Sequence, residues 1–144
     1  MTAQLSGGDQ TFVLGLAQVL GQFPDGGHVV IRAADGGAQV TLDSTGQGGI
    51  DIRVTAPRQL SDVEMDAMRS LGWADPDDEI PVWQQLARAD EADRHINQVA
   101  AFIYATFAVV DHVTSEDLTY EAWIGNPEHR VSLSALGLRK SADS

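Results

Sequence analysis

The histidines and acidic residues are the side chains of this sequence most suited to acid–base or metal chemistry. The four histidines are His28, His95, His112 and His129. No two of them have the i, i+4 spacing with which one helix face presents two zinc ligands. His95 beside Asp93 or Glu91 is the nearest approach to a partial metal site, but a surface histidine near a helix start is the simpler interpretation. Carboxylate pairs are plentiful, yet they lie in strongly acidic segments, whereas a general acid needs a buried carboxyl with a raised pKa.

Nucleophiles and phosphate-binding loops are also missing from the sequence. There is no cysteine, which excludes disulfides, a cysteine nucleophile and thiolate metal sites. No serine stands in a G-x-S-x-G elbow, and Lys140 is the sole lysine, so no Walker-type loop exists. The glycines at 26–27, 36–37 and 46–49 fall between expected strands, which predicts turns rather than a dinucleotide site. We therefore expect no enzyme activity, no catalytic residue, no metal site and no cofactor.

The formal net charge is −12, and the acidic residues are concentrated in one stretch. Ten of the 21 acidic residues lie between residues 61 and 93, where only Arg69 and Arg88 oppose them. Such a surface repels phosphate backbones and anionic lipid heads, so we expect neither nucleic acid nor a membrane as a partner. The stretch is typical of a solvated face plus a linker, and the sharper hypothesis is a docking surface for a basic partner. The run at residues 75–79 lacks the glycine and the distal glutamate of an EF-hand loop.

Three tryptophans are candidates for contacts with a partner. Trp73 follows a helix-ending glycine, a position that predicts a structural contact. Trp83 and Trp123 lie in weakly patterned segments, where the simpler interpretation is that they hold loops against the core. Because aromatic side chains anchor interfaces, the alternative is that Trp83, Trp123 or both line a partner groove, and these two are the predicted partner-binding residues.

Hydrophobic periodicity predicts the elements that must position these residues. A helix over 10–23 is followed by three strands with one apolar face, and the predicted strands are 28–34, 38–43 and 50–56. The turn at 35–37 is expected to be tight, whereas residues 44–49 are expected to form a flexible loop. The sequence therefore predicts an antiparallel meander with one apolar face.

Helices dominate the second half of the chain. A helix over 61–71 has a capping box from Ser61 and Glu64, and Gly72 ends it. Residues 74–81 read as an acidic linker, 82–89 as a short helix or turn, and 91–110 as a long apolar helix. Residues 118–124 are expected to form a last short strand, and no element is predicted beyond Asn126.

These elements define one α+β domain. We expect an antiparallel sheet of three to five strands covered on one face by helices, in the order helix, three strands, helix, short helix, long helix. The predicted boundaries are a flexible N-terminus over 1–9, the domain over 10–138 and a disordered tail over 139–144. The first residues lack the pattern of a signal peptide, and no stretch approaches the ~20 apolar residues of a membrane span, so the expected location is the cytoplasm.

Several of these motifs together resemble a known family. Leu60-Ser61-Asp62-Val63-Glu64, then Leu71-Gly72-Trp73, an acidic proline-containing linker, Trp83 and a long apolar helix resemble an actinobacterial pattern. It is that of the chaperone-like domains (TY-Chap) related to the YbjN family and to type III secretion chaperones, and the resemblance covers roughly residues 12–123. The resemblance implies a secretion-chaperone-like α+β fold, peptide binding and frequent dimerisation. It supplies no catalytic residues to carry over.

The predicted function is a non-enzymatic, chaperone-like module that binds a protein or peptide, neutral or basic, and forms a homodimer. A meander leaves at least one strand edge, and such an edge offers unpaired N–H and C=O groups to an incoming strand. Two alternatives stay open. One is a structural dimeric subunit of a larger assembly, and the other is a small-molecule sensor or enzyme with a pocket between sheet and helices.

Overall fold

The fold is taken from a computed structural model that describes residues 7–33, 36–79, 81–89, 93–111, 117–126, 128–133 and 136–140. In chain order its elements are α1 (Gly7–Gly21), β1 (Gly27–Ala33), β2 (Gln39–Gly46), β3 (Gly49–Thr55), α2 (Asp62–Ser70), β4 (Trp83–Arg88), α3 (Asp93–Asp111), β5 (Leu118–Ile124) and β6 (Arg139–Lys140). The predicted α+β class is confirmed. Among the described residues no helix is long and apolar enough to cross a membrane.

The strands form one sheet in the order β4-β3-β2-β1-β5-β6. The first five are antiparallel to their neighbours, and the two-residue β6 adds a parallel strand beside β5. The three predicted strands and the predicted strand at 118–124 are confirmed. The five-stranded antiparallel part lies within the predicted range, and β6 extends the sheet beyond it.

The segment predicted as a short helix or turn, residues 82–89, is instead strand β4, so that prediction was wrong. Two adjacent polar residues, Gln84 and Gln85, obscure the alternation that would have marked a strand. In the structure the segment pairs with β3 over six residues, from Val54 opposite Trp83 to Gly49 opposite Arg88. Pairing with an otherwise open strand decided the conformation here, as is common for weak local propensities.

The glycine-rich segment at 44–49 is a tight hairpin rather than a flexible loop. Strand β2 continues to Gly46 and β3 starts at Gly49, so that Gln47 and Gly48 alone form the turn. Both have positive φ, 55° and 80°, as in the type I′ turns that match the twist of paired strands. The prediction of a flexible loop over residues 44–49 was therefore wrong, because the turn has only two residues and paired strands lie on both sides of it.

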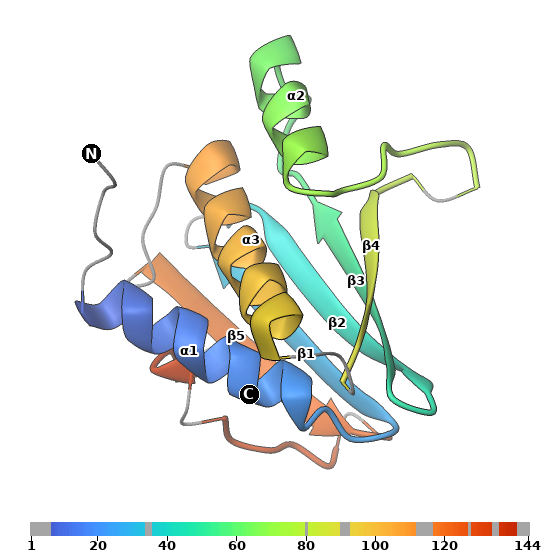
Figure 1. The fold of residues 1–144 in the computed structure, drawn as a ribbon, viewed down its shortest axis with the longest axis vertical. Helices are drawn as coiled ribbons and strands as arrows, with labels where there is room; N and C mark the ends of the chain where they lie inside the picture. Colours follow the sequence, from blue (N-terminus) through green and yellow to red (C-terminus); the bar gives the residue numbers. More distant parts are fainter. Residues whose placement is uncertain are drawn as a thin grey trace.

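Helices α1 and α3 pack together on one face of the sheet, and α2 stands at the end of the sheet (Figure 1). The predicted apolar stripe of α3 is buried throughout: Ile96, Val99, Ala100, Ile103, Phe107 and Val110. From the sheet, alternate residues such as Val40, Leu42, Ile50 and Ile52 meet these helices and are at most 1% exposed. Burial of each such side chain stabilises the fold by about 1.5–3 kcal/mol.

The opposite face of the sheet carries polar side chains in cross-strand pairs. His28 Nδ1 lies 2.6 Å from Asp43 Oδ1, and Arg32 reaches Gln39 at 3.1 Å and Glu121 at 2.9 Å. The alternation of the strands places these residues away from α1 and α3.

Helix α2 begins and ends as predicted. The Ser61 hydroxyl accepts from the Glu64 N–H at 3.2 Å, and the Glu64 carboxylate accepts from the Ser61 N–H at 2.9 Å, which completes the capping box. Gly72 has φ +89°, and the Trp73 N–H donates to the Met68 carbonyl at 3.2 Å, as in a Schellman motif. The buried Trp73 indole then donates to the Thr106 hydroxyl of α3 at 2.8 Å.

The described residues extend past both predicted domain boundaries. Helix α1 starts at Gly7, within the N-terminus expected to be flexible, and β6 lies at residues 139–140, where the tail was expected to begin. Residues 1–6 and 141–144 lie outside the described residues.

Candidate interaction site

The two tryptophans predicted to contact a partner lie in different parts of the molecule. Trp83, in β4, is 5% exposed and belongs to the core, and it also lines a cleft of about 380 Å³. Trp123, in β5, is separated from β4 by three strands. It is half-buried, stacks on His28 with ring centroids 5.4 Å apart, and lines a pocket of about 190 Å³. The structure does not bring the two side chains together, and their role in partner binding stays a prediction.

One edge of the sheet is covered by the chain itself. After β5 the chain reverses, and the Val131 N–H donates to the Ala122 carbonyl at 3.0 Å. Arg130 forms an isolated antiparallel bridge to Trp123, and β6 then pairs with β5 further along. The fully buried Leu136 packs into the core between these two contacts. We call the described residues 128–133 and 136–140 the C-terminal cover.

Among the described residues, the other edge, formed by β4, has a backbone partner at one point only. Ala74 and Gln84 exchange two backbone hydrogen bonds, at 2.8 and 3.3 Å. The backbone groups of Gln84 therefore point away from β3, and those of Leu86, two residues later, point the same way. Among the described residues, no backbone hydrogen bond involves Leu86 on that side. We call this stretch of β4, centred on Leu86, the open edge.

The Leu86 side chain adds an apolar surface to the open edge. It is 70% exposed and lies on the face of the sheet away from α1 and α3, since the buried Trp83 and Ala87 alternate with it. Sequence reasoning missed both β4 and Leu86 because the segment was read as helix or turn. The alternation of Trp83, Gln85 and Ala87 with Gln84, Leu86 and Arg88 was the available signal.

The cleft beside Trp83 lies between the end of β3, the linker to α2, α2 itself and the segment leading into β4. Apolar side chains in its lining include Val54, Leu60, Met65, Pro76, Pro81 and Trp83. Two charged residues, Arg58 and Asp75, also line it.

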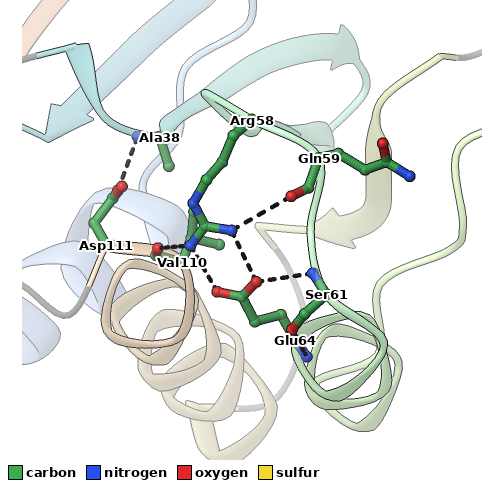
Figure 2. Close-up of polar contacts among 7 residues, drawn as sticks. All are labelled: Ala38, Arg58, Gln59, Ser61, Glu64, Val110 and Asp111. Carbon is green, nitrogen blue, oxygen red and sulfur yellow. Dashed lines mark hydrogen bonds and ion pairs between the residues drawn. The ribbon is translucent and has the colours of Figure 1, made fainter.

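Arg58 fixes the α2 side of this cleft (Figure 2). Its guanidinium donates to both carboxylate oxygens of Glu64, at 2.8 and 2.7 Å, and to the Val110 carbonyl at 2.7 Å. Val110 lies in the last turn of α3, where the helix dipole favours a cation. The next residue, Asp111, accepts from the Ala38 N–H at 2.8 Å. Arg58 thus ties the start of α2 to the end of α3, beside a contact that ties α3 to the chain entering β2.

The shifted pKa values report ion pairs rather than proton-transfer groups. Hydrogen bonds from Arg58, and then from the Ser61 N–H, lower the pKa of Glu64 to about 2. A hydrogen bond from Arg69 lowers the pKa of Asp75. The pKa values of Arg58 and Arg69 are raised, chiefly by hydrogen bonds to these carboxylates. Each shift favours the charged form, which is opposite to the raised carboxyl pKa that a general acid requires.

The described part of the chain holds no group of three or more His, Asp or Glu side chains placed to bind a metal ion. The partial site considered around His95 is only partly visible, because Glu91 and the side chain of Asp93 lie outside the described residues. The contacts most available to a partner are therefore backbone hydrogen bonds at a sheet edge and an apolar cleft, as in protein-binding domains that add a strand.

Comparison with known families agrees with this class. Residues 10–124 match the family described as "T3SS (YopN, CesT) and YbjN peptide-binding chaperone 3". The match spans most of the chain, and the protein belongs to this family of chaperone-like binding modules. The resemblance to the YbjN and type III secretion chaperone families is thereby confirmed. No curated protein and no solved structure shows a significant match to the chain.

Proposed function

We propose that the protein holds an extended segment of another protein, which adds as a strand to the open edge of β4. The observation that carries the proposal is the pair of backbone groups of Leu86, which point away from β3 and have no partner among the described residues. An incoming strand would satisfy both groups, and its side chains would meet the exposed Leu86 side chain. Membership of a family described as peptide-binding supports the same role.

The charge of the chain supports a partner segment that is neutral or basic. The net charge of −12 opposes the approach of nucleic acid and of acidic peptides. Main-chain hydrogen bonds tolerate many sequences, so a chaperone of this kind would recognise its partner by charge and by a few side chains.

A second copy of the chain is the competing occupant of the same edge. Two β4 strands placed antiparallel about Leu86 would pair the two Leu86 residues with each other, which opposes no like charges at that position. Such a homodimer would consume the edge. Peptide holding and edge-to-edge dimerisation therefore exclude each other at this site.

A small-molecule site in the cleft is less well supported. The cleft, about 380 Å³, is within the size range of ligand pockets. Its two charged groups are already paired, however, Arg58 with Glu64 and Asp75 with Arg69. Neither group is held ready for a small polar ligand.

Site-specific photocrosslinking in the native host tests the proposal. A benzoylphenylalanine residue replaces Leu86 at the open edge or, as the matched control, Leu14 of α1, a leucine that is also exposed, at 62%. We expect peptides of another protein to crosslink at position 86 and not at position 14. Self-links alone at position 86 would support the homodimer, and equal partner links at both positions would contradict edge binding.

The variant Leu86→Pro then tests the hydrogen bonds themselves. Proline removes the outward N–H and no bond to β3, so it is compatible with an edge strand. We expect the captured partner to be lost from Leu86→Pro and retained by Leu86→Ala, which keeps the N–H. Equal capture by both variants would mean that the backbone of β4 does not bind the partner.

A further inference from the structure

The cleft beside Trp83 lies close enough to the open edge to contact the same bound segment. Leu86 and Trp83 are three residues apart in β4, a span of about 10 Å at the rise of a β-strand. Ala74 is bonded to Gln84 and stops an added strand from continuing along β4 in this direction. A bound segment would have to turn at this point, toward Asp75 and Pro76, which form one wall of the cleft.

The walls of the cleft suit an apolar side chain. Val54, Leu60, Met65, Pro76, Pro81 and Trp83 supply apolar surface from four separate segments. The Arg58 guanidinium is turned to Glu64 and to the Val110 carbonyl. The one cation in the wall is therefore neutralised within the protein.

The exposed segment 75–79, which continues from the Asp75 and Pro76 wall and which we call the rim of the cleft, lies in a part of the chain with excess negative charge. Residues 58–79 carry seven carboxylates against two arginines, Arg58 and Arg69. Both arginines are already paired, Arg58 with Glu64 and Arg69 with Asp66 and Asp75. Asp78 and Glu79 follow Pro76 on the exposed segment that leads from this wall. A lysine or arginine beside an apolar anchor would be drawn to this rim, whereas an acidic residue would be repelled.

We propose that the cleft beside Trp83 is a specificity pocket, which takes an apolar side chain of the bound segment when a lysine or arginine stands next to it. The inference rests on the proposed function, since the cleft would contact a side chain of the segment that is bound at the open edge. Apolar burial supplies affinity in the cleft, and the rim selects against acidic sequences.

Selection from a random twelve-residue peptide library displayed on phage, with the full chain as bait, provides the probes. The enriched peptides are synthesised, and their affinities are measured by fluorescence anisotropy. We expect lysine or arginine next to leucine, phenylalanine or another large apolar residue. Enriched peptides without this pairing would overturn the inference.

Two variants of the protein locate the contact. Asp78→Asn with Glu79→Gln neutralises the rim, and Asp25→Asn with Glu128→Gln makes the same change of net charge at exposed sites elsewhere. We expect only the first pair to weaken binding, by about fivefold at low salt, since exposed charge pairs contribute modestly to affinity. The difference should vanish near 1 M salt. Equal weakening by both pairs would show a general charge effect and overturn the inference.

Gln59→Trp tests the cleft itself by placing a large side chain at its exposed linker wall. We expect it to weaken binding of the selected peptides, and unchanged binding would exclude the cleft as the pocket.

The Leu86→Pro variant separates this inference from the proposed function. If Leu86→Pro abolishes binding while the rim and Gln59 variants do not, strand addition at the open edge is supported and the cleft is not a specificity pocket. The reverse pattern would support the cleft as a binding pocket and contradict strand addition at the open edge. A library that yields no binder would overturn both proposals.

Discussion

The two edges of the sheet differ in how completely the chain covers them. Beside β5, the C-terminal cover supplies a backbone hydrogen bond to Ala122, a bridge to Trp123 and a short parallel strand. Beside β4, only Ala74 pairs, and Leu86 has no bond on its outer side among the described residues. Exposed edges invite pairing with other chains, and most folds protect them. Here one edge is protected, and the other has a short open stretch beside an acidic segment. This arrangement is expected of a protein that binds an added strand selectively.

The difference arises from the residues that follow or precede each strand. After β5, Gly125 adopts φ +70°, which lets the chain reverse, and Val131, Leu133 and Leu136 then pack on the core. Before β4, Pro76 and Pro81 have no N–H to donate to a neighbouring strand. The carboxylates at residues 75–79 remain exposed to water. The acidic segment therefore cannot lie along β4 as the C-terminal cover lies along β5.

Proline substitutions on β4 should distinguish the N–H groups that point to β3 from those that point to the open edge. We expect the largest loss of stability among these predictions here. The Ala89 N–H donates to Gly48 at 2.8 Å, so the N–H of Ala87, two residues earlier, also points to β3. We expect Ala87→Pro to lower the free energy of unfolding by about 3 kcal/mol or more. Leu86→Pro should change it by less than about 1 kcal/mol. Urea unfolding followed by tryptophan fluorescence measures both, and similar losses would contradict the assigned direction of the open edge.

Truncation of a buried side chain in the C-terminal cover tests the other edge. Leu136 is fully buried, and we expect Leu136→Ala to lower the free energy of unfolding by about 2–4 kcal/mol. Leu86→Ala is the matched control, because the same truncation at a side chain that is 70% exposed should cost at most about 0.5 kcal/mol. If Leu136→Ala has as little effect as the control, the C-terminal cover is not part of the folded core in solution.

The sequence predicted the parts of the fold whose local signals agree with their final contacts. The alternation of Ile50, Ile52 and Val54 and the stripe from Ile96 to Val110 identified a strand and a helix that both meet the core. The capping box of Ser61 and Glu64 was predictable because it is a contact between residues three positions apart.

The remaining parts depended on contacts between distant residues. Strand β4 exists because its residues pair with β3 residues that lie 29 to 39 positions earlier, and Gln84 and Gln85 hide its pattern. The sequence predicted that a strand edge would stay open, but which strand forms it could not be foreseen without β4. The C-terminal cover could not be foreseen either, because Arg130 and Val131 are placed by β5 rather than by a periodicity of their own.

Loss of the Ser61 cap should produce a smaller effect on the β4 side of the molecule. The Ser61 hydroxyl accepts from the Glu64 N–H at 3.2 Å, and we expect Ser61→Ala to lower the free energy of unfolding by about 1 kcal/mol. Ser61→Asp, which retains an acceptor and suits the helix dipole, should restore most of the loss. Peptide binding at the open edge should not change. An unaltered urea midpoint for Ser61→Ala would mean that this hydroxyl does not cap α2 in solution.

The smallest expected effect is the pH dependence of stability that arises from Glu64 at the start of α2. The pKa of Glu64 is about 2 in the folded chain, against an ordinary value of 4.5, because Arg58 and the Ser61 N–H bond to its carboxylate. A lowered folded pKa stabilises the fold above the ordinary value, and this contribution disappears as the pH falls from about 4.5 toward about 2. The stability difference between the natural protein and Glu64→Gln should therefore be largest above pH 5 and shrink across that window. Glu128→Gln, which removes an exposed carboxylate on the C-terminal cover, is the matched control for the loss of one negative charge. Chemical unfolding at several pH values measures both differences, and added salt should reduce the Glu64 effect because the pair faces solvent. A difference for Glu64→Gln that stays constant from pH 6 to pH 2 would show that the carboxylate does not hold Arg58 in solution, and that the start of α2 is fixed by its cap alone.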